Sequence, residues 1–154
     1  MSKYKEIGVN RKAHYDYEIT DTLEAGIVLF GTEVKSLRSN KVNLTDSYAG
    51  LTADNEVFLY QMGIPKYSMA NLTNHEPKRN RKLLLKKREI QKLIGALKKS
   101  GYSLIPLKIY FNEKGFVKIS LGLGKGKKNI DKRETIKERE WNREKSRILK
   151  NSFR

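Results

Sequence analysis

Five carboxylates in the first quarter of the chain are the side chains best suited to catalysis. They are Asp16, Glu18, Asp21, Glu24 and Glu33. A close pair of carboxylates can hold a divalent metal ion and support phosphoryl chemistry on a nucleic acid. Most carboxylates in such positions are simply solvated charges at strand ends, so we expect no catalytic pair among them.

Two other patterns associated with catalysis are incomplete. The glycine-rich stretch 122–128 resembles a phosphate-binding loop, but Leu121 stands where its first glycine belongs and Lys128 replaces the required Ser or Thr. The two histidines, His14 and His75, are far apart and lack the spacing of metal ligands. We therefore expect no catalytic residue, no metal site and no cofactor, and we expect that the protein is not an enzyme.

A dense run of cations points instead to nucleic acid. Seven basic residues fall within eleven positions, with no acidic residue before Glu89: Lys78, Arg79, Arg81, Lys82, Lys86, Lys87 and Arg88. A single lysine usually only solvates a surface, but cations at this density repel one another until an anionic partner relieves the repulsion. The run predicts contact with RNA or DNA.

The net charge of +16 is concentrated in two regions. Residues 1–77 carry eight basic and ten acidic groups, whereas residues 78–99 carry ten basic groups and one acidic group. Residues 124–154 carry twelve basic and five acidic groups. A protein that needed cations only for solubility would spread them more evenly, so the distribution predicts two polyanion-binding surfaces.

The C-terminal segment 124–154 has too few apolar residues to form a core, so we expect it to be disordered in the free protein. Asp131 and Glu134 have the spacing of a capping box, which predicts a helix that begins there and forms on an anionic surface. On this helix Ile130, Trp141 and Ile148 lie close to one line. Trp141 has no core to join, and we expect it to be buried against a partner.

Tyrosine and phenylalanine side chains are the other groups that could contact RNA, by stacking on bases. The chain has eight Tyr and five Phe residues, and at this frequency most should fill the core. The tyrosines that remain candidates for base contacts are Tyr15, Tyr17, Tyr48 and Tyr67.

These groups must be positioned by short segments rich in β-branched and aromatic residues, which predict strands. The predicted strands are 14–19, 26–30, 33–37, 47–52, 56–60, 102–111 and 116–121. The last two should form a hairpin around 112–115, with Pro106 on an edge or at a bulge. A helical turn is expected near Thr20 to Leu23, and residues 62–82 should form a long loop.

One helix is predicted at 86–100, because apolar residues repeat there at helical spacing before Gly101. Six or seven strands with one interposed helix predict a mainly β fold, a small closed barrel of the oligonucleotide-binding type. Gly122, Gly124 and Gly126 predict a linker. We therefore expect an RNA-binding domain at 1–123 and a basic tail at 124–154.

Composition also limits the location of the protein. The chain has no cysteine, which excludes disulfides and thiolate metal sites and favours an intracellular setting. No apolar run approaches the roughly 18 residues that span a membrane, and the N-terminus lacks the apolar stretch of a signal peptide. We expect a cytoplasmic protein without a membrane partner.

From about Asn10 to Arg154 the chain resembles the SsrA-binding protein family, the partner of transfer-messenger RNA in bacterial ribosome rescue. Several long segments carry the resemblance, in the family's order. They are NRKA at 10–13, EAGIVLFGTEVKSLR at 24–38, NHEPKRNRKLLL at 74–85, GKGKKNIDKRETIKEREW at 124–141 and RILKN at 147–151.

The resemblance implies a six-stranded antiparallel β-barrel of oligonucleotide-binding type with packed helices, and a tail that becomes helical on the ribosome. It also implies that the barrel binds the tRNA-like domain of transfer-messenger RNA and promotes its alanylation and its delivery with elongation factor Tu. The tail would then enter the decoding centre and the empty mRNA channel of the 30S subunit, against 16S rRNA. Elongation factor Tu and alanyl-tRNA synthetase would be reached through the RNA, and the protein would act as a monomer.

Individual residues are carried over in the same way. Glu24, Leu84 and Lys118 match family positions whose change impairs RNA binding. Glu24 could accept a hydrogen bond from a base or a 2′-OH, or orient an arginine; Lys118 suits a phosphate; Leu84 could pack under a base or fill the core. The full set expected to bind transfer-messenger RNA is Arg11, Lys12, Glu24, Lys78, Arg79, Arg81, Lys82, Leu84 and Lys118.

In the tail, the resemblance marks a hinge followed by a motif needed on the ribosome. The set is Gly126, Lys127 and Lys128 for the hinge, Asp131, Lys132 and Arg133 for the motif, and Trp141. Lys132 and Arg133 would contact rRNA phosphates, while Asp131 would cap the helix. Ile130 stands where relatives often have histidine or an aromatic residue, and it offers apolar contact without a stacking face.

Three rival interpretations share parts of this pattern. A structural ribosomal protein would have the same charge and the same extended tail. A generic basic protein would bind RNA without preference for one RNA over another. An RNA-processing enzyme would use the carboxylates at 16–24.

Overall fold

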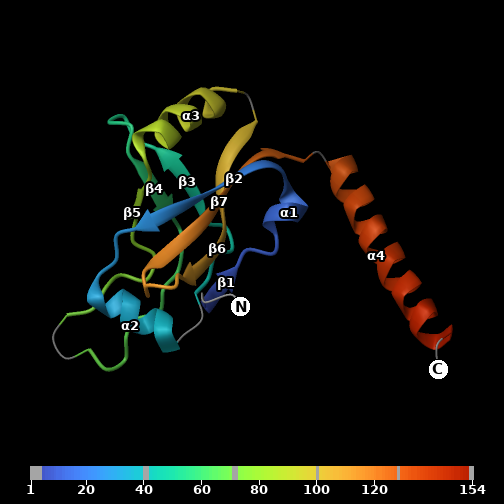
Figure 1. Cartoon of the computed structure of the whole chain (residues 1–154), viewed down its shortest axis with the longest axis horizontal. Helices are drawn as coiled ribbons and strands as arrows, with labels where there is room; N and C mark the ends of the chain where they lie inside the picture. The colour runs from blue at the N-terminus through green and yellow to red at the C-terminus, as the bar shows by residue number, and fades with distance from the viewer. Residues whose placement is uncertain (1–4, 40–41, 71–72, 100, 128, 153–154) are drawn as a thin grey trace.

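The computed structural model describes residues 5–39, 42–70, 73–99, 101–127 and 129–152 (Figure 1). The elements are, in chain order, β1 (Lys5–Val9), α1 (Ala13–Asp16), β2 (Tyr17–Ile27), α2 (Gly31–Ser39), β3 (Tyr48–Leu51), β4 (Val57–Tyr60), β5 (Arg81–Leu84), α3 (Lys87–Leu97), β6 (Tyr102–Phe111), β7 (Val117–Gly126) and α4 (Asn129–Ser152).

The seven strands form one antiparallel sheet whose pairings close on themselves. The order is β1-β6-β3-β4-β5-β2-β7, and β6 also pairs with β7, so the strands β2 to β7 form a ring. β1 pairs with the last residues of β6, on the same edge that pairs with β3. Closure removes the free edges of the six ring strands, which would otherwise offer unpaired backbone groups to other chains. The prediction of a mainly β, six-stranded antiparallel fold is confirmed.

The number of paired residues differs from one strand pair of the ring to the next. β2 and β7 pair along almost their whole length, from Tyr17 opposite Gly126 to Gly26 opposite Lys118. By contrast, β3 and β6 share one paired position in the part of the chain that the structure describes, Ala49 opposite Leu104. The ladder of paired residues is therefore shortest between β3 and β6.

Aliphatic side chains fill the ring. Leu59, Leu104, Ile109, Ile119 and Leu121 are all 0% exposed. Complete burial of one such side chain stabilises a fold by about 1.5–3 kcal/mol. The alternation of residues along each strand sends the other side chains outward, and this outer face carries the polar groups that matter for binding.

Two helices lie at opposite ends of the ring (Figure 1). α3, predicted at 86–100, is confirmed: Leu93 is buried in the core, and the Lys86 N–H donates to Glu89 Oε1 at 3.0 Å at the N-terminus of the helix. α2 lies at the other end and buries Ser36 and Leu37. The outer face of the ring therefore lies between α3 at one end and α2 at the other.

The β6–β7 hairpin also follows the prediction. The turn places Gly115 at φ +82°, a conformation that glycine adopts without strain. Pro106 lies at a shift in the β6–β7 register, which is the bulge that a residue without an N–H requires. A turn of this kind fixes the register of the two strands.

Several predictions of local structure are wrong. Residues 33–37 belong to α2 rather than a strand, because the Glu33 carboxylate accepts the Phe30 N–H at 2.8 Å and so starts a helix. Residues 14–16 lie in α1, and the turn expected at 20–23 lies inside β2. β1 and β5 were not expected, since each is short and carries charges.

The predicted glycine linker is also wrong, because Gly122, Gly124 and Gly126 lie in β7. A Cβ on Gly124 would come within 2.9 Å of Ile19 Cδ1, and one on Gly122 within 3.0 Å of Leu107 Cδ1. These two glycines permit close packing rather than flexibility.

α4 stands away from the ring and comes near it only at its root, beside α1 (Figure 1). The helix predicted in the tail is confirmed, with its start at Asn129 instead of Asp131. Ile136, Trp141 and Ile148 are 39%, 63% and 63% exposed, as expected for a helix without a core. Disorder of the tail in the free protein stays a prediction. Among the described helices, none is long and apolar enough for a membrane crossing.

Candidate RNA-binding surfaces

Three strands meet at Gly26, the next-to-last residue of β2. Gly26 is paired with Leu84 of β5 on one side and with Lys118 of β7 on the other. A Cβ at Gly26 would lie 3.3 Å from Leu84 Cβ and 3.7 Å from Lys118 Nζ. Both neighbouring side chains therefore stand over the glycine, and they share the outer face of the sheet.

Glu24 joins them from two positions earlier on β2, which places it on the same face. Its carboxylate accepts a hydrogen bond from the phenol of Tyr110, a β6 residue that is 6% exposed and is paired with Lys118. Glu24, Leu84 and Lys118 line one shallow hollow of about 450 Å³. These three residues lie 34 or more positions apart in the sequence, and the register of the strands brings them together.

The environment of each residue suits a different part of a nucleotide. Leu84 is 52% exposed, so it is a surface residue, and the alternative that it fills the core does not hold. Lys118 brings a cation to within reach of a phosphate bound over Gly26. Lys86, at the N-cap of α3, lines the same hollow and adds a second cation.

Phe116 extends this surface, and the sequence did not single it out. It follows the Gly115 turn, is 63% exposed and lines a neighbouring hollow of about 330 Å³ together with Leu84 and Lys118. The signal available in the sequence was an apolar residue placed directly after a tight turn, where the core is out of reach. We call Glu24, Gly26, Leu84, Lys118 and Phe116 the Gly26 surface.

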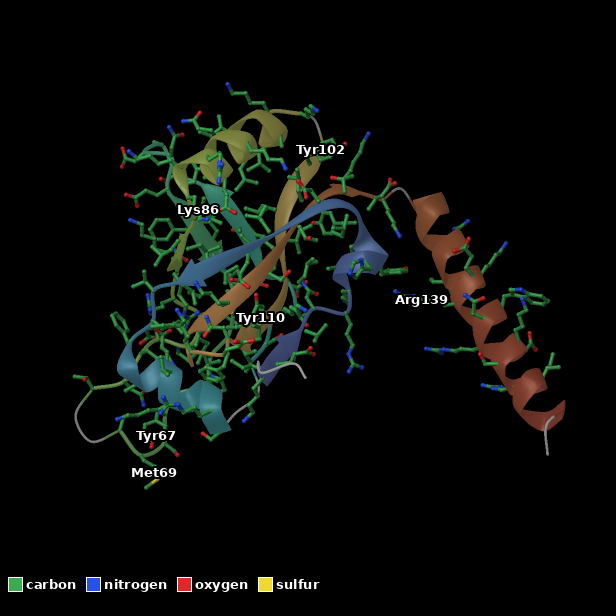
Figure 2. The ribbon with its side chains drawn as sticks, in the orientation of Figure 1. Tyr67, Met69, Lys86, Tyr102, Tyr110 and Arg139 are labelled. Atoms are coloured by element: carbon green, nitrogen blue, oxygen red, sulfur yellow. The ribbon has the colours of Figure 1, made fainter. Side chains whose placement is uncertain are left out.

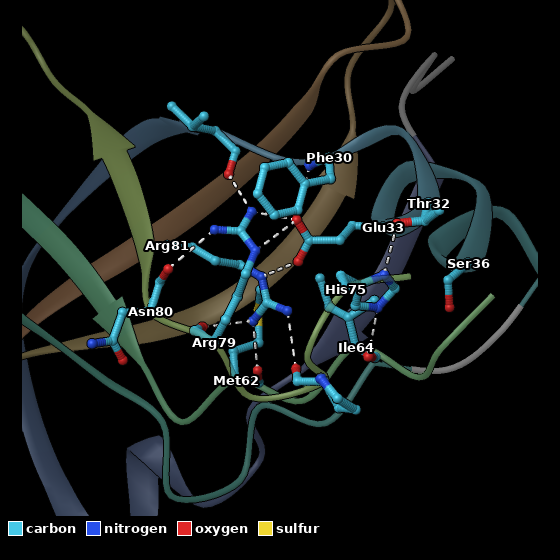
Figure 3. A network of polar contacts seen from close by, with 12 residues as sticks. Phe30, Thr32, Glu33, Ser36, Met62, Ile64, His75, Arg79, Asn80 and Arg81 are labelled. Atoms are coloured by element: carbon cyan, nitrogen blue, oxygen red, sulfur yellow. Dashed lines mark hydrogen bonds and ion pairs between the residues drawn. The ribbon is translucent and has the colours of Figure 1, made fainter. Parts of the chain in front are cut away.

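Arg81 is a correction to the predicted RNA-binding set. Its side chain is 0% exposed, and its guanidinium donates to Glu33 Oε2 at 2.5 Å, to the carbonyl of Met62 at 2.7 Å and to that of Pro77 at 2.9 Å (Figure 3). A fully buried guanidinium with these partners does not reach an RNA phosphate. Arg81 instead ties the loop before β5 to α2.

Arg79 belongs largely to the same network. It donates to Glu33 Oε1 through two nitrogens and to the carbonyl of Val28, and its guanidinium lies 4.1 Å from the ring centre of Phe30. Its side chain keeps 21% exposure. The seven cations of the run therefore fall into two groups. Arg81 and Arg79 are held by contacts that stabilise the fold, and the other five face solvent.

Glu33, which is 0% exposed, is the centre of this network. Burial acts to raise the pKa of its carboxyl, but the hydrogen bonds from Arg79, from the Phe30 N–H and from Arg81 outweigh burial, and the net pKa is lowered. Burial lowers the pKa of Arg81, against the opposing effect of Glu33. The carboxylate is thus held in its charged form.

His75 closes the other side of the network, as Figure 3 shows. Its Nε2 lies 3.0 Å from the carbonyl oxygen of Ile64, and its Nδ1 lies 2.9 Å from the Thr32 hydroxyl. A neutral ring that donates from Nε2 and accepts at Nδ1 satisfies both contacts. His75 therefore has a structural role, because both of its ring nitrogens are used in contacts with neighbouring residues.

The other predicted cations are spread over the surface. Lys78 is exposed, and Lys82 pairs with Glu56 at 3.6 Å with both side chains 44% exposed. Arg11 and Lys12 are exposed just before α1, and they are not among the residues that line the hollow at Gly26. Lys87 and Arg88 are exposed on the first turn of α3, next to Lys86.

The five candidate carboxylates do not converge. Asp21 pairs with Lys92 at 2.7 Å, and this hydrogen bond lowers the pKa of Asp21. Glu33 is buried in an ion pair with Arg81, whereas Glu24 accepts a hydrogen bond from Tyr110. In the part of the chain that the structure describes, no group of three or more His, Cys, Asp or Glu residues is arranged to hold a metal ion.

The tail begins at a fixed point. Gly126 ends β7, and its N–H donates to the carbonyl of Gly101 at 3.2 Å. The Lys127 N–H donates to the carbonyl of Asp16, and its Nζ donates to the carbonyl of His14, both at 2.9 Å. The predicted hinge residue Lys127 is thus bound to α1, while its neighbour Lys128 lies outside the described residues.

The other tail residues follow on α4, away from the Gly26 surface. Asp131 and Lys132 lie in its first turn, with side chains outside the described part, and Arg133 is exposed. Figure 2 shows Arg139 on α4 far from Lys86 and Tyr110. The protein therefore presents two separate basic regions, one on the ring and one on the tail.

Comparisons with known proteins agree with this arrangement. Residues 7–151 match the family model described as "SmpB protein". The "SsrA-binding protein" of Rhizobium meliloti (strain 1021) is 58% identical over 146 residues, 95% of this chain and 91% of that protein. The "SsrA-binding protein" of Agrobacterium fabrum (strain C58 / ATCC 33970) is 58% identical over 146 residues, again 95% and 91%.

A solved structure described as "tmRNA-SmpB: a journey to the center of the bacterial ribosome" is also similar. It is 49% identical, covers 81% of this chain and 87% of its own, and superposes with a TM-score of 0.67. The resemblance found in the sequence is confirmed by these independent matches. The chain belongs to the SmpB protein family.

Proposed function

We propose that this protein is a non-enzymatic RNA-binding factor of trans-translation, which binds the tRNA-like domain of transfer-messenger RNA through the Gly26 surface. The observation that carries the proposal is the convergence of Glu24, Leu84 and Lys118 in one exposed hollow. The name of its relatives, SsrA-binding protein, and the description of the similar structure, which names tmRNA, SmpB and the bacterial ribosome, support the same conclusion.

Each side chain of the surface has a distinct task in this proposal. Lys118 and Lys86 neutralise phosphates, which supplies salt-dependent affinity. Glu24, oriented by Tyr110, accepts a hydrogen bond from a base edge or from a 2′-OH, and the 2′-OH contact would distinguish RNA from DNA. Leu84 packs under an exposed base or ribose, and Lys87 and Arg88 extend the contact along the phosphate backbone.

The tail serves the second RNA. In this proposal the exposed cations of α4, among them Arg133, bind 16S rRNA at the decoding centre and in the empty mRNA channel, and Trp141 is buried there. The division into a ring domain and a tail follows residues 1–123 and 124–154, although β7 continues to Gly126. Elongation factor Tu and alanyl-tRNA synthetase are reached through the RNA, and the protein acts in the cytoplasm as a monomer.

Binding to two RNAs across a salt series tests the proposal. The purified chain is titrated against the tRNA-like domain of transfer-messenger RNA and against an ordinary tRNA. We expect a clear preference for the former, and a salt slope that falls by about one for Lys118→Ala. Lys66→Ala, an exposed loop lysine outside the hollow, is the matched control. Equal affinity for both RNAs would leave only a generic basic RNA-binding protein.

Occupancy of the ribosome separates the proposal from a structural ribosomal protein. A rescue factor is removed from ribosomes by salt and is present below one copy per ribosome. Fixed stoichiometry on salt-washed ribosomes would overturn the proposal in favour of the structural role.

A further inference from the structure

A hollow of about 460 Å³ lies where the ladder of the ring is shortest, beside the Ala49–Leu104 pair that joins β3 to β6. Its lining includes three tyrosines, Tyr17, Tyr48 and Tyr102. Its volume falls in the range of sites that bind small ligands, roughly 300–1,000 Å³. We call this the tyrosine hollow, and it shares no lining residue with the hollow at Gly26.

The tyrosine hollow lies at the root of the tail. Tyr17 is paired with Gly126, the last residue of β7, and Tyr102 is paired with Lys125. Figure 2 shows Tyr102 at the end of the sheet from which α4 departs, with Tyr110 well away toward the other end. A ligand in this hollow would therefore sit beside the first residues of the tail.

Tyr48 gives the hollow a stacking face. Its side chain is 50% exposed, and its ring lies 5.2 Å from the ring of Tyr60 at an interplanar angle of 31°. Contact with Tyr60 already restricts the Tyr48 ring, so a base that stacks on its exposed part costs little further side-chain freedom. Aromatic faces that are already ordered in this way are the usual platforms for unpaired bases.

The polar groups around the hollow match the rest of a nucleotide. Lys12 lines it and is exposed, which suits a phosphate at the rim. Two carboxylates also line it: Asp16, which is half-buried, and Asp46, which is exposed and has φ +63°. A carboxylate here disfavours an anion without hydrogen-bond donors, but it accepts from an exocyclic amino group or a 2′-OH. Aromatic, cationic and acceptor groups together select a nucleotide over a simple anion or a lipid.

We propose that the tyrosine hollow binds a single unstacked nucleotide of ribosomal RNA, with the base on Tyr48 and a phosphate at Lys12. The inference rests on the proposed function, which places the tail on the ribosome. Ribosomal RNA is favoured over transfer-messenger RNA because the hollow adjoins the root of α4 and is separate from the Gly26 surface. The nucleotide would fix the ring domain while the tail enters the ribosome.

Affinity measurements on the full chain test this inference. We expect Tyr48→Ala to weaken binding to 30S subunits about tenfold, as loss of one base stack does, and to leave affinity for the tRNA-like domain within about twofold. Tyr48→Phe keeps the stacking face and should bind 30S subunits like the wild type. Met69→Ala, at an exposed residue on the loop near α2 at the other end of the ring, is the matched control.

Lys12→Ala provides a second variant in case loss of Tyr48 disturbs Tyr60. We expect it to reduce the salt slope of 30S binding by about one. Unchanged 30S affinity in both Tyr48→Ala and Lys12→Ala would overturn the inference.

A photo-crosslinker in place of Tyr48 identifies the bound RNA directly. We expect a crosslink to one position of rRNA on stalled ribosomes. Crosslinks to transfer-messenger RNA alone would overturn the inference and leave the proposed function standing. Failure of the wild-type chain to prefer the tRNA-like domain would instead overturn the proposed function, so the two failures are distinguishable.

Discussion

Tyr110 donates its phenolic hydrogen bond to the carboxylate of Glu24, from a position that is almost completely buried to one that is exposed. The two residues lie on strands that are not paired with each other, because β7 runs between β2 and β6. Tyr110 therefore reaches past a strand to hold a surface carboxylate. A glutamate on an outer face would otherwise sample several rotamers, and this contact selects one of them.

Removal of that hydroxyl should affect both RNA binding and stability, by similar amounts of free energy. We expect Tyr110→Phe to weaken affinity for the tRNA-like domain about fivefold, because Glu24 must then be ordered by the RNA itself. The stability loss should be about 1 kcal/mol, the usual net value of one hydrogen bond. Filter binding and thermal unfolding measure the two effects. A variant that loses stability but binds RNA normally would show that Tyr110 does not orient Glu24 for binding.

The glycines of β7 allow a matched comparison. We expect Gly124→Ala to destabilise the fold by about 1–3 kcal/mol, because the new Cβ would lie 2.9 Å from Ile19 Cδ1 and 3.1 Å from the Glu18 carbonyl oxygen. Gly126→Ala should change little, since no atom lies within 4 Å of its Cβ position. Urea unfolding of both variants gives the difference. Equal stability would mean that position 124 behaves as the flexible linker first predicted.

The buried carboxylate should be essential to the fold. We expect Glu33→Gln to cost about 3–5 kcal/mol, because it leaves the Arg81 guanidinium buried without its counter-charge. Asp21→Asn breaks the exposed pair with Lys92 and should have little effect, so it serves as the control. A Glu33→Gln protein as stable as the Asp21 variant would refute the role assigned to the network.

The same carboxylate predicts loss of stability in acid. The pKa of Glu33 is lower in the folded chain than its ordinary value of 4.5, so the unfolded chain binds the proton more readily. The stability from Glu33 is therefore complete above about pH 4.5 and decreases as the pH falls through the lowered pKa of the folded state. Urea unfolding between pH 3 and pH 7 measures this slope. The slope should become shallower in Glu33→Gln, and an unchanged slope would assign it to other groups.

Truncation should separate the two RNA-binding regions. A chain that ends at Lys127 keeps all of β7, and we expect it to bind the tRNA-like domain with unchanged affinity but to support no peptide tagging on stalled ribosomes. A chain that ends at Leu123 loses the β7 residues paired with Tyr17, Glu18 and Ile19, so it should also be less stable. Tagging by the shorter chains would show that the tail is dispensable.

The parts of the fold that could be predicted were those with a local signal. The α3 stripe, the 112–115 turn and the bulge at Pro106 all depend on residues close together in sequence. α2 was mistaken for a strand, since Val34 and Leu37 also suit a strand, and only the contact of Glu33 with Phe30 decides for a helix. In α2 the capping interaction outweighs the local preference of Val34 and Leu37 for a strand.

Most residues of the candidate site could be predicted from the sequence, but their arrangement in space could not. The cation run gave the right chemistry, yet Arg81 and Lys82 are adjacent and differ completely in exposure, because β5 turns one inward and the other outward. That alternation could not be seen without recognition of β5 itself. Likewise, the approach of Leu84 and Lys118 over Gly26 depends on the register of three strands, which no local pattern fixes.

The attachment of Lys127 to α1 makes α4 a lever arm. A helix of 24 residues is about 36 Å long, so a rotation of about 10° at its root moves its far end by about 6 Å. The two hydrogen bonds from Lys127 to His14 and Asp16 therefore fix the point on the ring domain from which this helix extends. Any change of α1, a helix of a single turn, would move that point.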